Sequence, residues 1–121
     1  MPSLPESSLD KTLVALADPT RRAILAQLAD GDARMTEVAA PFDMSLNAVS
    51  KHVRLLERAG LVHREILGRE HRLSFVGDPL LEAGDWIDFY RRFWKKRLAG
   101  LDAFLKRQAS EKPKPKKAPK S

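Results

Sequence analysis

The feature that most constrains this chain is the stretch 45–62, which reads S-L-N-A-V-S-K-H-V-R-L-L-E-R-A-G-L-V. Its apolar residues recur at offsets of three and four, which predicts one stripe of an α-helix facing a core. Ser45 is a good N-cap, and Gly60 ends a helix through the left-handed conformation that glycine adopts at little cost. The predicted stripe comprises Leu46, Val49, Val53 and Leu56, widened by Leu55.

The opposite face of this helix carries small, amide, hydroxyl and cationic groups, and no acidic residue before Glu57. Such a face suits the major groove of DNA, because small residues permit close approach while donors reach base edges and phosphates. The alternative is an ordinary amphipathic helix with a solvated polar face, and the neighbouring elements decide between the two. The residues of this face are Asn47, Ala48, Ser50, Lys51 and Arg54.

Three helices are predicted before this one. The first runs over residues 8–17 with Ser7 or Ser8 as its cap, and Asp18 caps a second that begins at Pro19. Arg21 and Arg22 lie near the N-terminus of the second helix, where a cation is disfavoured, so they need Asp10, Asp18 or phosphate as a partner. After a linker at 32–34, a short helix from Thr36 precedes the helix opened by Ser45, which makes a helix-turn-helix unit.

A β-hairpin is predicted next. Residues 61–67 and 71–76 are partly alternating stretches that flank Gly68-Arg69-Glu70. A hairpin directly after a recognition helix is a wing, and an arginine at its tip, here Arg69, is suited to the minor groove. Arg64 and Arg72 on the two strands either contact DNA or are solvated or paired with Glu65 and Glu70.

The last helix opens at Asp78-Pro79 and carries six of the eight aromatic residues of the chain. Its apolar residues form two adjacent stripes, more than so small a domain can cover, so a partner is expected and a second copy is favoured. A two-fold dimer would present two recognition helices roughly 34 Å apart to an inverted repeat. An aromatic ligand pocket between helices is the competing interpretation.

Composition narrows the class of protein further. The length of 121 residues and the hydrophobic content of 43% indicate one globular domain, with no apolar run long enough for a membrane span. The N-terminus lacks the pattern of a signal peptide, so a cytoplasmic location is expected. Four of the six net positive charges belong to the Lys/Pro-rich end of the chain, which either attracts phosphate or only aids solubility. The expected organisation is a flexible N-terminus (1–7), one domain (8–108) and a disordered tail (109–121).

Two motifs carry a resemblance to a known family: L-A-D-P-T-R-R-A-I-L-A-Q-L at 16–28 and A-V-S-K-H-V-R-L-L-E-R-A-G-L-V at 48–62. With the order of elements, they make residues 9–105 similar to the ArsR/SmtB family of bacterial transcriptional repressors. The resemblance implies a mainly α winged helix-turn-helix fold, with five helices and a two-stranded wing. It also implies base contacts by Asn47, Ala48, Ser50 and Lys51, backbone contacts by Thr36, Ser45, His52 and Arg54, and a minor-groove contact by Arg69.

Dimerisation through the first and last helices is a further implication of the resemblance. The residues expected at the dimer interface are Leu9, Leu13, Trp86, Ile87, Tyr90, Phe93, Trp94, Leu98 and Leu101.

The chain departs from the family at the positions where many members sense metals. It has no cysteine, and its last helix offers carboxylates but no histidine, which makes a poor transition-metal site. We therefore expect no regulatory metal and no cofactor, and an inducer, where one acts, of unknown chemistry. No nucleophile set or phosphate loop points to an enzyme. The alternatives are a metal-responsive repressor with a carboxylate site and a winged-helix module that binds protein or RNA.

Overall fold

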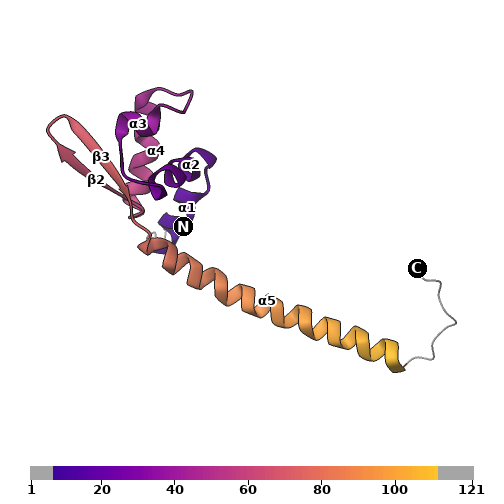
Figure 1. Cartoon of the computed structure of the whole chain (residues 1–121). Coiled ribbons are helices and arrows are strands. Elements are labelled where there is room, and N and C mark those ends of the chain that lie inside the picture. The colour runs from indigo at the N-terminus through magenta and orange to yellow at the C-terminus, as the bar shows by residue number, and fades with distance from the viewer. Residues whose placement is uncertain (1–6, 112–121) are drawn as a thin grey trace, which may run out of the picture. The chain divides into compact units, whose positions relative to one another are not determined.

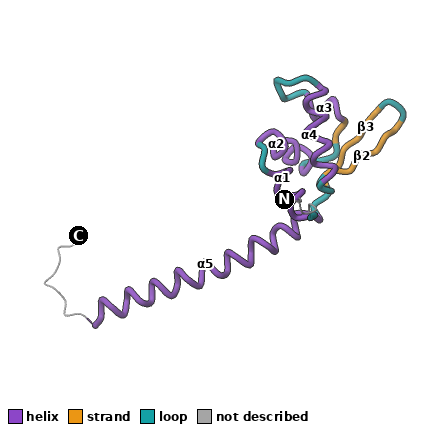
Figure 2. Tube along the Cα trace, turned by 180° about the vertical axis from the view of Figure 1, so that it is seen from behind, coloured by secondary structure: helices purple, strands orange, loops and turns teal. Residues whose placement is uncertain are grey.

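The elements follow one another as two helices, a two-residue strand, two more helices, a hairpin and a long helix (Figures 1 and 2). The structure is a computed structural model that describes residues 7–111. Residues up to Gly84 form one compact unit and those from Asp85 a second, where the sequence predicts one domain. The elements are α1 (Ser8–Leu16), α2 (Pro19–Ala29), β1 (Ala33–Arg34), α3 (Met35–Ala39), α4 (Leu46–Arg58), β2 (Val62–Leu67), β3 (Glu70–Phe75) and α5 (Asp78–Glu111).

The predicted caps set the helix boundaries in the first unit. Ser7 and Asp10 form a capping box at the start of α1. The Asp18 carboxylate accepts the N–H of Arg21 at 3.1 Å, with Pro19 at the first helical position of α2. These two predicted N-termini are confirmed.

Helix α4 also has the predicted ends. The Ser45 hydroxyl accepts the N–H of Ala48 at 3.1 Å, and Gly60, two residues beyond the helix, has φ +78°. Three members of the predicted stripe, Val49, Val53 and Leu56, are fully buried. Leu46 was also expected in the core but is 50% exposed, because the first turn of α4 extends past the edge of the core.

The core of the first unit joins α4 to α1, α2, α3 and the sheet. Its members are apolar and nearly all contributed by helix stripes and by the inward face of the hairpin. Apart from the hydroxyl of Thr12, which donates to the Ser8 carbonyl, the buried side chains among the described residues are hydrophobic. The cluster contains Ala15, Ile24, Leu25, Leu28, Met35, Val38, Val49, Val53, Leu56, Ala59, Leu61, Val62 and Leu73.

The wing belongs to a three-stranded antiparallel sheet in the order β1-β3-β2, so the prediction of two strands is wrong in this respect. Ala33 and Arg34, expected in a linker, pair with Leu73 and Arg72 and so satisfy backbone groups along one edge of β3. Beyond that point the wing is a two-stranded ribbon. Leu67 faces Glu70 in the last pair, and Gly68 at φ +64° begins the two-residue turn.

The second unit consists of α5 from Asp85 onward. The helix reaches Glu111, three residues into the predicted tail, because Ala109, Ser110 and Glu111 permit a helix and no breaker precedes Pro113. Residues 1–6 and the tail from Lys112 lie outside the described residues. Along residues 7–111, no helix combines the length and the apolar character that a membrane crossing requires.

Candidate nucleic-acid interface

One face of α4 forms an exposed basic stripe, which we define as Asn47, Lys51 and Arg54. Offsets of four and three place these residues on successive turns of the same face, and all three are exposed. Ala48 and Ser50 are half-buried and lie at opposite edges of the stripe. The stripe is therefore bordered by small side chains that allow a close approach to the helix.

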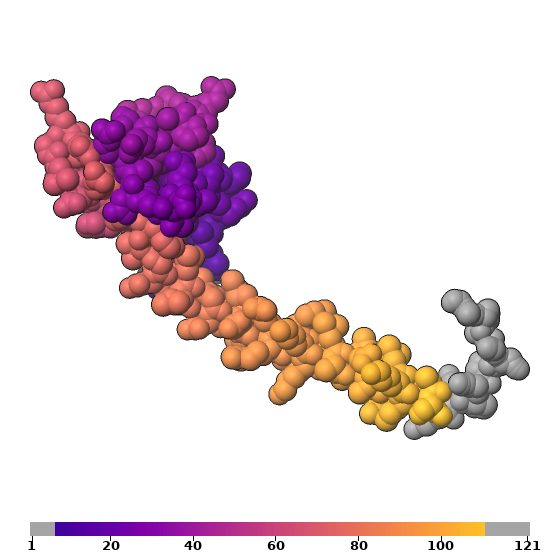
Figure 3. Space-filling view, in the orientation of Figure 1, coloured from indigo at the N-terminus to yellow at the C-terminus, as the bar shows by residue number. Residues whose placement is uncertain are grey.

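Arg69 occupies the tip of the wing and is exposed. The other two wing arginines have acidic partners: Arg64 binds Glu57 and Arg72 lies 3.2 Å from Glu70. No hydrogen bond or ion pair among residues 7–111 engages the side chain of Arg69. In the space-filling view the distal end of the wing projects as a narrow ridge (Figure 3). Arg69 is thus the wing cation that is available to an external anion.

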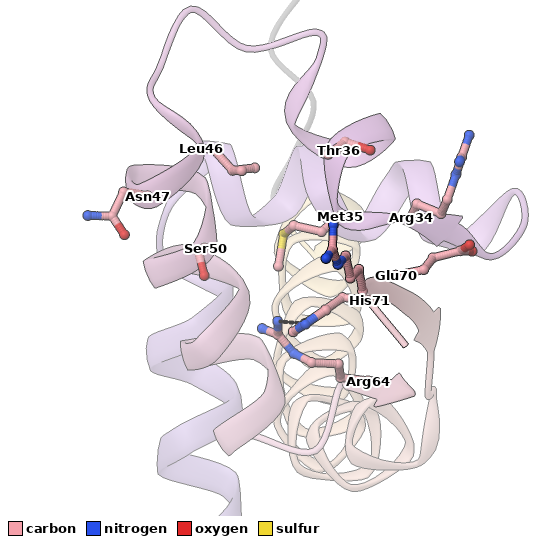
Figure 4. A pocket seen from close by; sticks show the side chains of 10 residues that line it. Arg34, Met35, Thr36, Leu46, Asn47, Ser50, Arg64, Glu70 and His71 are labelled. Carbon is pink, nitrogen blue, oxygen red and sulfur yellow. Dashed lines mark hydrogen bonds between the residues drawn. The ribbon is translucent and has the colours of Figure 1, made fainter. Parts of the chain in front are cut away.

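A hollow of about 720 Å³ lies between the N-terminal part of α4, the start of α3 and the wing (Figure 4). Of the predicted DNA-contacting residues it brings together Thr36, Asn47, Ser50 and Arg69, whereas Ser45, Ala48, Lys51, His52 and Arg54 do not line it. The sequence analysis did not place the remaining lining residues at this surface, apart from Arg64, for which DNA contact was one alternative. Arg34 has no local signal, since the pairing of β1 with β3 brings it to the wing. The remaining lining residues are Arg34, Met35, Leu46, Arg64, Glu70 and His71.

His52 lies at the edge of α4 that faces the junction of α1 and α2. Its side chain is 21% exposed, and its Nδ1 atom lies 3.1 Å from Nη1 of Arg21 and 3.8 Å from a carboxylate oxygen of Asp18. Because a guanidinium only donates, Nδ1 must accept, and the neutral ring then carries its proton on Nε2. Nε2–H of His52 makes no hydrogen bond within residues 7–111.

Arg21 and Arg22 find their partners at the C-terminal end of α1. Arg21 donates through Nε to the Ala15 carbonyl at 2.8 Å and through Nη2 to the Val14 carbonyl at 3.0 Å. Arg22 donates to the Leu16 carbonyl at 2.7 Å. These carbonyls carry the negative end of the α1 dipole, so they satisfy the two cations that α2 places unfavourably at its own N-terminus. The sequence analysis did not consider backbone carbonyls as partners.

Two carboxylates near this surface serve as helix caps. The backbone N–H of Arg21 holds the pKa of the Asp18 carboxyl below its ordinary value, and the Arg21 charge lowers it further. At α3, the backbone N–H of Arg34 donates to Glu37 at 2.8 Å and lowers the pKa of that carboxyl, helped by the Arg34 side chain. Within the described ranges, no three His, Asp or Glu side chains gather as a metal site would require.

The residues expected at a dimer interface divide between the two units. In the first unit, Leu9 and Leu13 of α1 are half-buried. In the second unit, Tyr90 makes edge-on contacts with Trp86 and Phe89, with ring centroids 5.1 and 5.0 Å apart. These contacts along one helix leave its apolar surface uncovered: the expected residues Trp86, Ile87, Tyr90, Phe93, Trp94, Leu98 and Leu101 are 45–57% exposed.

Comparisons with known proteins agree with the helix-turn-helix geometry. A family model described as a helix-turn-helix domain matches residues 16–65. The HTH-type transcriptional regulator Rv2034 of Mycobacterium tuberculosis is 38% identical over 95 residues, which cover 77% of this chain and 84% of the relative. The transcriptional repressor SdpR of Bacillus subtilis is 34% identical over 79 residues, 65% of this chain and 88% of SdpR.

A solved structure extends the agreement to three dimensions. The crystal structure of the ArsR family transcriptional regulator RHA00566 has a TM-score of 0.70 and 35% sequence identity, and the match covers 74% of this chain and 98% of that one. The match therefore spans nearly the whole of that regulator.

Proposed function

The chain belongs to the ArsR family of transcriptional regulators, and from this premise we propose that it represses transcription by binding an inverted-repeat operator as a homodimer. One observation carries the proposal for DNA. The side chains of Lys51, Arg54 and Arg69 make no hydrogen bond or ion pair with any residue in 7–111, whereas Arg21, Arg22, Arg34, Arg64 and Arg72 are all bonded within the fold. Among the arginines of the first unit, those without such a partner in residues 7–111 are Arg54 and Arg58 on α4 and Arg69 at the wing tip.

The proposed DNA contacts follow from these positions. Helix α4 enters the major groove, where Asn47 and Lys51 reach base edges and the small Ala48 and Ser50 permit the approach. The phosphate backbone is contacted by Arg54 of the stripe and by three further polar residues, Thr36, Ser45 and His52. Arg69 enters the adjacent minor groove, where the potential is most negative at A·T-rich sequence.

We propose a second copy of this chain as the partner of α5. An apolar surface of this extent is unusual for a monomer. The charges on the helix are also segregated, with Asp85 and Asp88 before the basic residues Arg91, Arg92, Lys95 and Lys96. A two-fold related copy running in the opposite direction would set acidic against basic residues while the aromatic stripes pack together. Leu9 and Leu13 of α1 would extend the interface.

The test is a gel-shift titration of the purified protein on the DNA immediately upstream of its own gene, with unrelated DNA as competitor. We expect binding that survives excess competitor, weakens steeply as salt rises, and gives a footprint of two half-sites one helical turn apart. Binding equal to that on the competitor would exclude an operator there. Duplexes selected from a random pool then decide whether the chain prefers any sequence, and no enrichment would contradict sequence-specific binding altogether.

A further inference from the structure

Arg64 joins α4 to both strands of the wing. Its Nε donates to one oxygen of Glu57 at 3.1 Å and its Nη2 to the other at 2.8 Å. Its Nη1 lies 2.8 Å from Nδ1 of His71, a contact drawn in Figure 4. Glu57 belongs to α4, Arg64 to β2 and His71 to β3. The side chains of Arg64 and Glu57 are only 16% and 28% exposed. One guanidinium therefore connects α4 with both strands of the wing.

The chemistry of this link limits what its members do. The two parallel bonds to Glu57 fix the plane of the guanidinium, as in other fork-shaped pairs of arginine and carboxylate. Because the guanidinium only donates, Nδ1 of His71 accepts and its ring carries the proton on Nε2. Arg64 is thus committed within the protein, in contrast to Arg69, five residues further along the chain.

The bonds of Arg64 lie close enough to the wing tip to restrict its position. His71 in β3 pairs with Ile66 in β2. The next pair toward the tip, Leu67 with Glu70, is the last pair before the turn. Past the β1 pairings the ribbon has little packing support, since Ile66 is 61% exposed and Leu67 51%. Among residues 7–111, the bonds of Arg64 to Glu57 are the only side-chain hydrogen bonds between the wing and α4, and the bond of Arg64 to His71 carries this link to β3 next to the turn.

We propose that Arg64 is a positioning residue, which sets the separation between the basic stripe of α4 and Arg69 so that both engage one DNA molecule. This inference rests on the proposed function, in which those two surfaces contact DNA together. Arg64 itself makes no DNA contact in the proposal. In the proposal Arg64 raises DNA affinity only by holding Arg69 in place. The effect of removing Arg64 should therefore depend on whether Arg69 is present.

The test is a double-mutant cycle of Arg64→Ala and Arg69→Ala, measured by fluorescence anisotropy on a duplex that the wild-type protein selects from a random pool. We expect Arg64→Ala to weaken binding about tenfold in the wild-type background and less than about twofold in the Arg69→Ala background. Equal losses in both backgrounds would overturn the proposal. Arg72→Ala is the matched control, since it removes another wing arginine whose partner, Glu70, lies on the wing itself.

A measurement on the free protein separates this proposal from the proposed function. Nuclear magnetic resonance of wild-type protein should show His71 with its proton on Nε2 and ordered amides at Gly68 and Arg69. Arg64→Ala should abolish the tautomer preference and lower the order parameters at the tip, whereas Arg72→Ala should change neither. If no duplex is selected, the proposed function fails and this measurement still decides the role of Arg64.

A milder variant covers the case in which Arg64→Ala does not fold. Glu57→Gln keeps the side-chain volume but replaces one acceptor oxygen by a donor, so it should loosen the wing tip to a smaller extent. A wing tip that is as ordered in Glu57→Gln as in the wild type would contradict the proposal.

Discussion

Helices α4 and α5 are both amphipathic, but only α4 has its apolar stripe covered by the rest of its own unit. Val49, Val53 and Leu56 have no exposed surface, whereas Phe93 and Trp94 in the second unit are 55% and 57% exposed. The two helices show the same spacing of apolar residues. Periodicity therefore reveals that a face is to be covered, while the covering element has to be found in the structure or in a second chain.

The two units also differ in how their charges are paired. In the first unit Arg64 forms a fork-shaped pair with Glu57 at 2.8 Å, largely shielded from solvent. In the second, Asp88 pairs with Arg91 and Asp102 with Lys106 on the surface of one helix, with more than half of each side chain exposed. Pairs of the latter kind add little stability. We therefore expect the second unit to be stabilised mainly by apolar packing against a partner.

The largest effect that this comparison predicts is on assembly. Trp94→Ala should raise the dissociation constant of the dimer by on the order of a thousandfold, because a two-fold interface loses the large side chain twice. Sedimentation velocity over a range of protein concentrations measures the change. Lys106→Ala is the control on the same helix, since its side chain is 78% exposed. A Trp94→Ala protein that stays dimeric at nanomolar concentration would show that this face is not the interface.

The next largest effect concerns the covered stripe of α4. Leu56→Ala should lower the free energy of unfolding by about 3 kcal/mol, because Leu56 is fully buried and its truncation leaves a cavity. Urea denaturation measures the loss. The same loss is expected when the starting protein already carries Trp94→Ala, because the two sites belong to separate units. A clearly smaller loss in that background would show that the core of the first unit depends on the dimer.

A substitution on the exposed face of α4 is predicted to change DNA binding but neither stability nor dimerisation. Lys51→Ala should weaken operator binding about tenfold and reduce the salt dependence by about one counterion, because one cationic contact is lost. The melting temperature and the dimer should not change, since Lys51 is exposed and has no partner among residues 7–111. Anisotropy titrations at several salt concentrations provide the measurement. Operator affinity equal to that of Lys106→Ala would remove Lys51 from the interface.

Features of this fold that depend on local chemistry were predictable from the sequence. The caps at Ser7, Asp18 and Ser45 and the glycine after α4 depend on contacts within a few residues, and all four are confirmed. The stripe of α4 and the turn of the wing are local in the same sense. The winged helix-turn-helix architecture then followed from the order of these elements.

Features that depend on distant residues were not predictable in the same way. The strand at Ala33 needs an open edge on β3, and two residues give too short a pattern to reveal it. For Arg64 the sequence left DNA, solvent and the wing acids Glu65 and Glu70 open as partners, and the fold presents Glu57 from α4 instead. The hollow at the candidate interface has the same origin, since it is lined by residues of β1, α3, α4 and the wing, which only the tertiary structure brings together.

The smallest predicted effect tests a charged cap of the first unit. The N–H of Arg21 holds the pKa of Asp18 below its ordinary value of 3.8, so folding favours the ionised carboxylate. The resulting stability is fully present above about pH 4 and is lost as the pH falls through the lowered pKa.

Asp18→Asn keeps a side-chain oxygen as the cap but does not ionise. The stability difference between wild type and Asp18→Asn should therefore shrink as the pH falls from 5 to 2, as thermal melts at each pH would show. A difference independent of pH would mean that the Asp18 charge adds nothing to the cap, and that the junction of α1 and α2 is held by the Arg21 bonds to the α1 carbonyls alone.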